Sequence, residues 1–232
     1  MMTGRAGEPL LLVIDTATRR AVVALGRPDG AVVSVDAWAA GYRHGAELLG
    51  RLEALLEGAS AGAPARAALG RVAGVIVGTG PGAFTGLRVG IATAKALAVG
   101  LGVPMAAVST GAALLAAAGE PGAALLLPAG PSDRTLVAGG RAVVLPAGEE
   151  PVVPDGMLLV AVDLPGRAPE DAQARGAAAL DALPAALVRL GAARLARGER
   201  DDPATLAPDY VTLPRGVNRA GGAVTLQAGP GS

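Results

Sequence analysis

The chain has 232 residues, of which 51% are hydrophobic and 2% aromatic, and this length suits one large domain or two small ones. Its 20 basic residues balance its 20 acidic residues, so no broad positive field favours nucleic acid or an anionic membrane. No cysteine is present, which excludes a disulfide scaffold, a thiolate metal site and a cysteine nucleophile.

Two apolar stretches resemble targeting or membrane segments but carry interrupting charges. The N-terminal run contains Asp15 and has neither a long apolar region nor a clear cleavage site, so it does not read as a signal peptide. The segment Leu87–Val103 contains Arg88 and Lys95 and is too short and too charged for a good membrane span. We expect a soluble, cytoplasmic protein.

Short apolar runs and helical leucine spacing predict the secondary structure in chain order. The turn Pro28-Asp29-Gly30 separates the second strand from the third, because proline presets φ and glycine accepts positive φ. The predicted strands are Leu10–Thr16, Ala21–Gly26, Ala31–Ala39, Val72–Val77, Met105–Ser109, Leu125–Pro128, Thr135–Gly139, Ala142–Leu145 and Met157–Val162. The predicted helices are Arg43–Gly58, Thr85–Leu101, Pro169–Leu180 and Pro184–Arg197.

The first hundred or so residues therefore read β-β-β-α-β-α-β. This order resembles one half of the actin/hexokinase/Hsp70-like (ASKHA) α/β fold, and the less regular second half is consistent with an eroded copy of the same lobe. The predicted domains are an N-terminal lobe over residues 1–103, a C-terminal lobe over 104–214 and a disordered tail over 215–232, since the tail lacks an amphipathic pattern.

The loop GTGPGA, between the fourth predicted strand and the helix that follows it, resembles two nucleotide motifs. As a dinucleotide fingerprint it needs an acidic residue about 20 positions further on, yet none occurs between Glu57 and Glu120. As a P-loop it needs a closing Lys-Ser/Thr pair, whereas Lys95 lies well inside the helix.

A third reading of the loop is structural. Glycines permit tight turns, and Thr85 is a suitable helix N-cap. This structural loop comprises Gly80, Pro81, Gly82, Phe84 and Thr85. Small residues then recur every four positions along the helix, at Gly86, Gly90, Ala94 and Ala98. Such a face admits close packing, either on the chain's own sheet or on a partner, and we predict a partner interface.

Several motifs together resemble the TsaB (YeaZ) family of bacterial proteins needed for threonylcarbamoyladenosine formation on tRNA. They are IDTAT at Ile14–Thr18, RHGAELL at Arg43–Leu49, GPGAFTGLRVGIATAKALA at Gly80–Ala98 and GVPMAAVST at Gly102–Thr110. The family's terminal P-x-Y-x-R motif is matched by Pro208–Thr212, with threonine in place of arginine, and its Asp-Ala-Arg segment is absent from the second half.

The resemblance implies a two-lobed fold, a homodimer, a heterodimer with the catalytic paralogue TsaD, the ATPase TsaE as a further partner, and contact with tRNA only through the complex. TsaD transfers the threonylcarbamoyl group to the adenosine next to the anticodon, and the TsaB subunit is regarded as non-catalytic. In TsaD the equivalent strand ends in an H-x-x-x-H metal pair, whose positions correspond to Thr110 and Leu114 here. Leucine cannot ligate a metal and threonine replaces imidazole poorly, while the single histidine, His44, makes no cluster. We expect no metal and no catalytic residue.

The turn Asp15-Thr16-Ala17-Thr18 follows the first predicted strand, where ATP-using relatives of the fold place a D-x-G-T/S turn. Ala17 adds a Cβ where close backbone approach favours glycine. Asp15, Thr16 and Thr18 are therefore either a polar strand end that satisfies turn amides or a vestigial nucleotide turn. We expect no cofactor on the isolated chain, with ATP or ADP bound only weakly or at a partner interface. A nucleotide-dependent kinase or hydrolase of the same fold is the alternative function.

Overall fold

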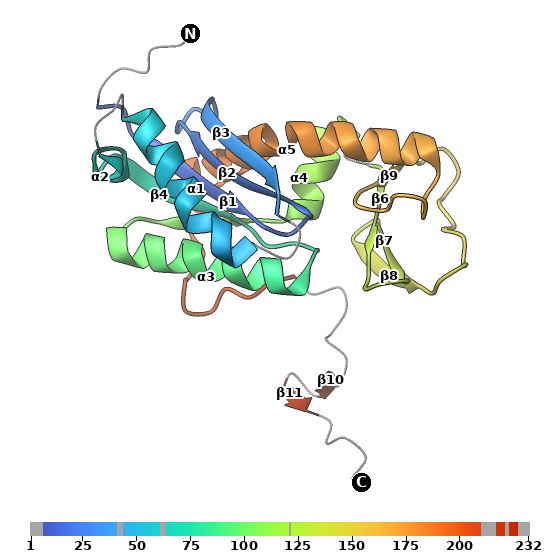
Figure 1. Cartoon of the computed structure of the whole chain (residues 1–232). Helices are drawn as coiled ribbons and strands as arrows, with labels where there is room; N and C mark the ends of the chain where they lie inside the picture. The colour runs from blue at the N-terminus through green and yellow to red at the C-terminus, as the bar shows by residue number, and fades with distance from the viewer. Residues whose placement is uncertain are drawn as a thin grey trace.

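The structure is a computed structural model that describes residues 7–40, 44–60, 64–120, 122–209, 217–220 and 223–226. Two sheets lie side by side and share one long helix, α5 (Glu170–Ala196) (Figure 1). The larger sheet contains β1 (Leu10–Asp15), β2 (Arg20–Gly26), β3 (Val32–Ala39), β4 (Val72–Gly78) and β5 (Met105–Val108). Its strand order is β3-β2-β1-β4-β5, with β1, β4 and β5 parallel and β2 and β3 antiparallel to their neighbours.

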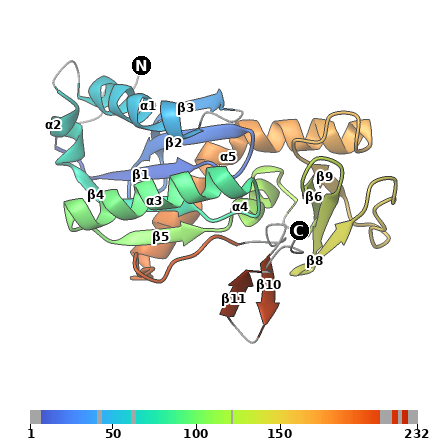
Figure 2. The same cartoon turned by 60° about the horizontal axis from the view of Figure 1, so that its bottom comes forward.

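Helices cover both faces of the larger sheet, which explains why β1 is apolar along almost its whole length. On one face lie α1 (His44–Ala59) and α3 (Phe84–Leu101), with the short α2 (Ala65–Leu69) beside α1. On the other lie α4 (Thr110–Ala117) and α5 (Figure 2). Alternate β1 residues divide between the two cores, as the period of two in a strand requires: Leu12 packs toward α1 and α3, and Val13 toward α5.

The smaller sheet repeats part of this plan. Its strands are β6 (Ala124–Pro128), β7 (Arg134–Ala138), β8 (Arg141–Leu145) and β9 (Leu159–Ala161). They follow the order β8-β7-β6-β9, with β6 and β9 parallel, which matches β3-β2-β1-β4 of the larger sheet. Residues 146–158 join β8 to β9 without a helix, and within the described residues this sheet has four strands. The α/β class and the ASKHA-like plan with an eroded second lobe are confirmed.

Several element predictions differ from the structure. The strand β5 pairs with β4 in the larger sheet, as the predicted β-β-β-α-β-α-β order has it, so the predicted lobe boundary after residue 103 falls before the last strand of that sheet. The two predicted C-terminal helices are one continuous α5 that contains Pro184. Proline inside a helix costs about 3 kcal/mol, and buried side chains on both sides of it, Leu183 and Leu187, hold the helix together here. The helices α2 and α4 were not predicted, although Ser109 caps α4 by accepting a hydrogen bond from the N–H of Ala112.

The tail over 215–232 was predicted to be disordered, but its described residues form a hairpin of β10 (Val217–Ala220) and β11 (Ala223–Leu226). The other residues of the tail lie outside the described residues. The Gly-Gly pair between the two strands is a recognised hairpin signal. Elsewhere, α3 and α5 are long and apolar enough to cross a membrane by length and composition alone. Both pack against the sheets, as the core helices of globular proteins do.

Candidate functional site

The turn after β1 holds a fully buried carboxylate. Asp15 is 0% exposed, and its Oδ1 atom accepts a hydrogen bond from the N–H of Ala17 at 2.9 Å. Its Oδ2 atom accepts a hydrogen bond from the hydroxyl of Thr110, the first residue of α4, at 2.6 Å. Both carboxylate oxygens therefore bind groups of the protein itself.

The same network reaches the glycine loop. The Thr110 hydroxyl also accepts a hydrogen bond from the N–H of Gly80 at 3.0 Å, so it joins the β1 turn to the loop that follows β4. A Cβ added to Gly78 would lie 1.7 Å from Asp15 Oδ2. Only glycine at that position leaves room for the buried carboxylate.

The glycine loop rests directly on the β1 turn. Gly80 has a φ of 98°, which glycine adopts readily, and the N–H of Ala83 donates to the Ala17 carbonyl at 2.7 Å. A Cβ on Gly82 would lie 2.1 Å from that carbonyl oxygen. The loop's glycines thus allow contact between two backbone segments, which agrees with the structural reading of the loop.

The small-residue face of α3, predicted as a partner interface, packs inside the chain instead. Thr16 Oγ1 donates to the Gly86 carbonyl at 2.7 Å. A Cβ added to Gly90 would lie 2.2 Å from the same Thr16 Oγ1 atom. Further along the helix, Ala94 is 0% and Ala98 is 1% exposed, both in the core beneath α3. The partner-interface prediction is wrong for this face because β1 and its turn already occupy the groove.

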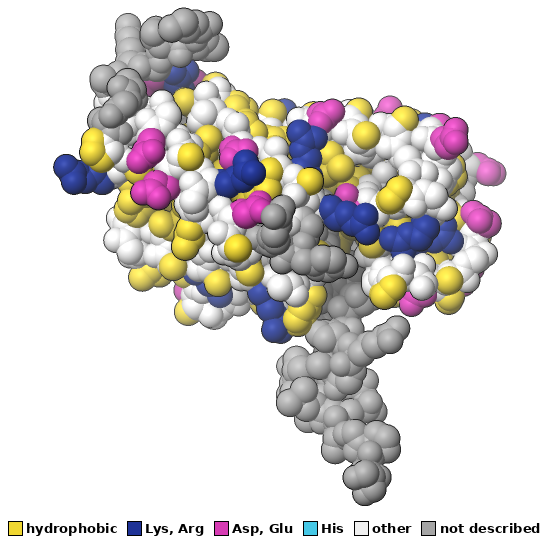
Figure 3. Space-filling model, in the orientation of Figure 1, with side chains coloured by type: hydrophobic (Ala, Val, Ile, Leu, Met, Phe, Trp, Pro, Cys, Tyr) yellow, Lys and Arg dark blue, Asp and Glu magenta, His cyan; other side chains and the backbone are white. Residues whose placement is uncertain are grey.

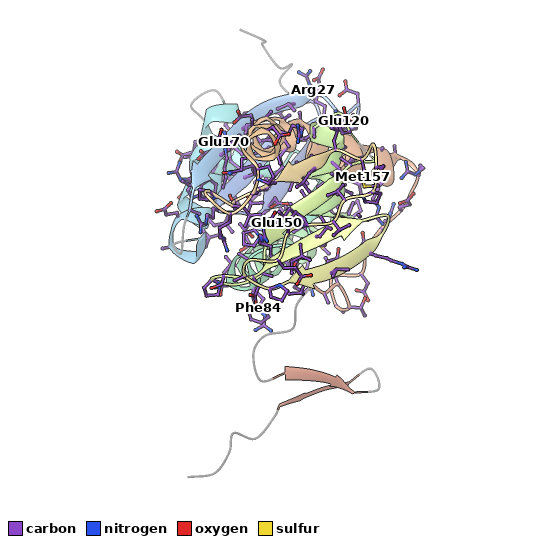
Figure 4. The ribbon with its side chains drawn as sticks, turned by 90° about the vertical axis from the view of Figure 1, so that its right-hand side faces the viewer. Arg27, Phe84, Glu120, Glu150, Met157 and Glu170 are labelled. Carbon is purple, nitrogen blue, oxygen red and sulfur yellow. The ribbon has the colours of Figure 1, made fainter. Side chains whose placement is uncertain are left out.

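Two details at the start of α3 also differ from the sequence prediction. The N-cap residue is Ala83, with no side-chain cap, so Thr85 lies inside the helix and does not cap it. Phe84 instead stacks with Arg88, whose guanidinium carbon is 3.8 Å from the ring centroid; Figure 4 labels Phe84 at the edge of the molecule. A cation over an aromatic face contributes about 0.5–1 kcal/mol at an exposed site.

The remaining side chain of the predicted nucleotide turn also serves the backbone. Thr18 Oγ1 donates to the Arg20 carbonyl at 2.7 Å and accepts from the Arg20 N–H at 3.2 Å. Thr16 and Thr18 are 1% and 2% exposed. The structure therefore brings Asp15, Thr16 and Thr18 together, and it does so as a buried set of turn and strand-end contacts.

The two positions that were predicted to correspond to the metal histidines of TsaD are both occupied by packing residues. Thr110 is engaged by Asp15 and Gly80, and Leu114, one turn further along α4, is 0% exposed in the core. Among the described residues, no group of three or more His, Asp or Glu side chains lies close enough to hold a metal ion. His44 begins α1, and its side chain lies outside the described residues.

Two aspartates near the turn were not found by sequence reasoning. Asp163, after β9, accepts a hydrogen bond from the Arg19 N–H at 2.7 Å and so links the smaller lobe to the β1 turn. Its φ is 59°, and burial raises the pKa of its carboxyl above the ordinary 3.8. Asp209 accepts from the Thr79 hydroxyl at 2.9 Å and donates its N–H to the Thr79 carbonyl at 2.8 Å. The position of Asp209 had a sequence signal, since this residue belongs to the terminal family motif at Pro208–Thr212.

Comparison with solved structures returned two proteins from Pseudomonas aeruginosa. One, described as similar to the peptidase YeaZ, is 26% identical with a TM-score of 0.62, over 88% of this chain and 100% of its own. The other is YeaZ, also 26% identical, with a TM-score of 0.60 over 87% of this chain and 99% of its own. A search of curated proteins gave no significant match.

The two related sheets and the buried turn between them define an α/β protein of the actin/hexokinase/Hsp70-like class. The family model for TsaD, the tRNA N6-adenosine threonylcarbamoyltransferase, matches residues 43–181. The chain therefore belongs to the TsaD family, and its likeness to YeaZ over most of its length identifies the TsaB (YeaZ) branch.

Proposed function

We propose that this chain is a non-catalytic subunit that activates a TsaD partner for threonylcarbamoyl transfer to the tRNA adenosine next to the anticodon. The observation that carries the proposal is the state of Thr110 and Leu114, the two positions at which the sequence resemblance implies the metal histidines of TsaD. One has its hydroxyl bound to Asp15 and Gly80, and the other is fully buried in the core. Restoring a metal centre there would disrupt the junction of the turn, the loop and α4.

The isolated chain is also proposed to bind no nucleotide firmly at the β1 turn. Both oxygens of Asp15 have partners within the protein. The Ala17 carbonyl, at the turn's centre, accepts the N–H of Ala83 from the glycine loop. A nucleotide phosphate would have to displace these buried contacts, and each buried group left unpaired costs about 1–3 kcal/mol. ATP or ADP would then bind only weakly or where a partner, such as TsaE, completes a site.

The association surface is proposed to lie on the outer side of the same helical layer. There, α1 exposes 62% of Leu49 and α3 exposes 69% of Val99, and Ala92 and Ala96, one turn apart on α3, are also exposed. Figure 3 shows hydrophobic side chains among scattered charges over these helices. Small exposed residues allow close helix approach, so we assign both the homodimer and the TsaD heterodimer to this surface and expect the two assemblies to compete.

A reconstitution experiment tests the proposal. The chain is mixed with TsaD from the same organism, analysed by size-exclusion chromatography with light scattering, and assayed for transfer to tRNA with the enzyme that supplies threonylcarbamoyl-adenylate. We expect a TsaD heterodimer, transfer that requires both proteins, and none by this chain alone. Transfer by the chain alone that a chelator abolishes would overturn the proposal, as would a TsaD that neither binds the chain nor responds to it.

Contact with tRNA is proposed to arise only in the assembled, cytoplasmic complex. The chain has zero formal net charge and few aromatic residues, and phosphate contacts by basic side chains dominate affinity for nucleic acid. A gel-shift assay at physiological salt should show only weak binding, with a dissociation constant of roughly 10⁻⁴ to 10⁻⁶ M. Submicromolar binding by the isolated chain would contradict this part of the proposal.

A further inference from the structure

A hollow of about 650 Å³ lies in the smaller lobe, at the edge where the parallel strands β6 and β9 end. It is built by the loops that follow β6, β8 and β9, and its lining includes Ser132, Arg134, Gly148, Glu150, Arg167 and Pro169. Figure 4 looks onto this end of the molecule and labels Glu150 there. Open α/β sheets bind ligands outside the carboxyl ends of their parallel strands, and the volume falls within the range of small-molecule sites.

Arg134 places a buried positive charge beside this hollow. It is 6% exposed, and its guanidinium donates to the Arg167 carbonyl at 2.8 Å and to the Glu149 carbonyl. Within the described parts of the chain these are its only acceptors, and neither is a carboxylate. Three of its five N–H groups are left for another acceptor. A buried charge is costly unless it is paired, so an anionic ligand would be stabilising here.

Two further features at the hollow favour an anion. Arg167 donates to the Pro131 carbonyl at 3.0 Å, and the structure gives it no carboxylate partner among the described residues. The 27-residue helix α5 also begins here, after Pro169 and without a side-chain cap, and a helix N-terminus carries a partial positive charge.

Carboxylates near this hollow include Asp133, next to Arg134, and Glu149, next to Glu150, besides the three that follow. Asp171, in the first turn of α5, is paired with Arg175 at 2.7 Å. Glu150 lines the hollow, and Glu170 lines a smaller hollow next to it. Both of these glutamates are exposed, so solvent and salt screen their charges far more than that of the buried Arg134.

We propose that this hollow binds the phosphate group of a small phosphorylated molecule, held by Arg134 and Arg167. Guanidinium groups match phosphate oxygens in a forked, two-point geometry, and the start of α5 adds backbone N–H donors. None of the lining residues is aromatic, so the site offers no stacking platform for a nucleobase. The ligand class is therefore a phosphate ester without a base-recognition requirement, such as a sugar phosphate.

Calorimetry on the whole chain tests this proposal, with inorganic phosphate, ribose 5-phosphate and AMP as probes at constant ionic strength. We expect saturable binding of phosphate, tighter or equal binding of ribose 5-phosphate, and no further gain with AMP. Arg167→Gln should weaken phosphate binding at least tenfold, whereas Arg141→Gln, an exposed arginine on β8 of the same sheet, should bind as the unmodified chain does. Glu150→Gln should tighten binding severalfold, which a purely structural role of the loop would not produce.

Arg134 is also tested, with its folding monitored, because it ties two loops together. If Arg134→Gln unfolds the lobe, phosphate binding by the Arg167→Gln and Glu150→Gln variants still tests the proposal. Equal weakening by Arg167→Gln and Arg141→Gln, or a response to phosphate no larger than to chloride at the same ionic strength, overturns the proposal. Preference for AMP by tenfold or more overturns the assignment of ligand class.

Discussion

Adding a single methyl group at Gly90 tests whether the small-residue face of α3 serves the core. A Cβ there would lie 2.2 Å from Thr16 Oγ1 and 3.3 Å from Thr16 Cβ. Thr16 is 1% exposed and its hydroxyl is held by the Gly86 carbonyl at 2.7 Å, so the side chain has little room to move. We expect Gly90→Ala to lower stability.

The magnitude follows from three opposing effects. Overfilling a packed interior costs about 1–3 kcal/mol, and displacing the hydroxyl of Thr16 loses a hydrogen bond worth about 1 kcal/mol. Replacing glycine with alanine in a helix returns roughly 1 kcal/mol. The free energy of unfolding should therefore fall by about 1–3 kcal/mol, and each kcal/mol lowers Tm by about 2–4 °C in a chain of this size.

Gly100→Ala is the matched control, because Gly100 lies on the same helix and a Cβ there meets nothing within 4 Å. It should leave Tm unchanged or raise it slightly through helix propensity. Thermal melts and urea titrations of both variants give the difference. Combining Gly90→Ala with Thr16→Ala should recover much of the loss, since the obstructing hydroxyl and methyl are then gone.

The outcome that would refute the reasoning is a Gly90→Ala protein as stable as Gly100→Ala. Additive effects of Gly90→Ala and Thr16→Ala would be equally damaging, because they would show that the two positions do not touch. Loss of self-association or of TsaD binding at unchanged Tm would show instead that this face contacts a partner.

Four further substitutions extend these tests. Ala94→Leu should lower stability by about 1–3 kcal/mol in a thermal melt, whereas Ala96→Leu, exposed on the same helix, should keep Tm and reduce TsaD binding in light scattering. Thr110→Val should cost about 1–3 kcal/mol in urea unfolding, because it removes the buried hydroxyl that donates to Asp15 and accepts from the Gly80 N–H. Burial raises the pKa of Asp163 above 3.8, so the folded chain binds the proton of this carboxyl more tightly than the unfolded chain does. The contribution of Asp163 to stability therefore declines as pH rises from about 4 through the raised pKa. Melts across pH 4–7 should show that Asp163→Asn lacks this decline.

The larger sheet could be predicted from the sequence because its signals are local. Strands such as β1 are continuous apolar runs, and a sheet covered on both faces produces such runs. Spacing of leucines in α1 likewise matches the buried face that contains Leu48, Leu52 and Leu55. The helix α5 shows the limit, since Pro184 signals a break locally, yet buried contacts on both sides keep the helix continuous.

What packs against the small-residue face of α3 could not be predicted, for a different reason. Periodicity shows that Gly86, Gly90, Ala94 and Ala98 share a side, but it carries no information about what fills the groove. The group that fills it at Gly90 is Thr16, whose bond to Gly86 spans 70 positions of sequence. The hollow at Arg134 is similar, because its lining comes from three loops that the sequence gives no reason to bring together.

The Asp15 network changes how loss of activity in this chain must be interpreted. If the turn were a nucleotide site, a defect after replacing Asp15 would point to chemistry at its carboxylate. Here the same carboxylate links β1 to α4 across 95 positions, and Thr110 extends the link to the glycine loop. Replacing Asp15 therefore loosens the junction of three elements, and a partner that docks on α1 and α3 would be affected without any chemistry at the turn. A complex that fails with Asp15→Ala, but recovers when the variant is assayed well below its lowered Tm, would identify the turn as a structural junction.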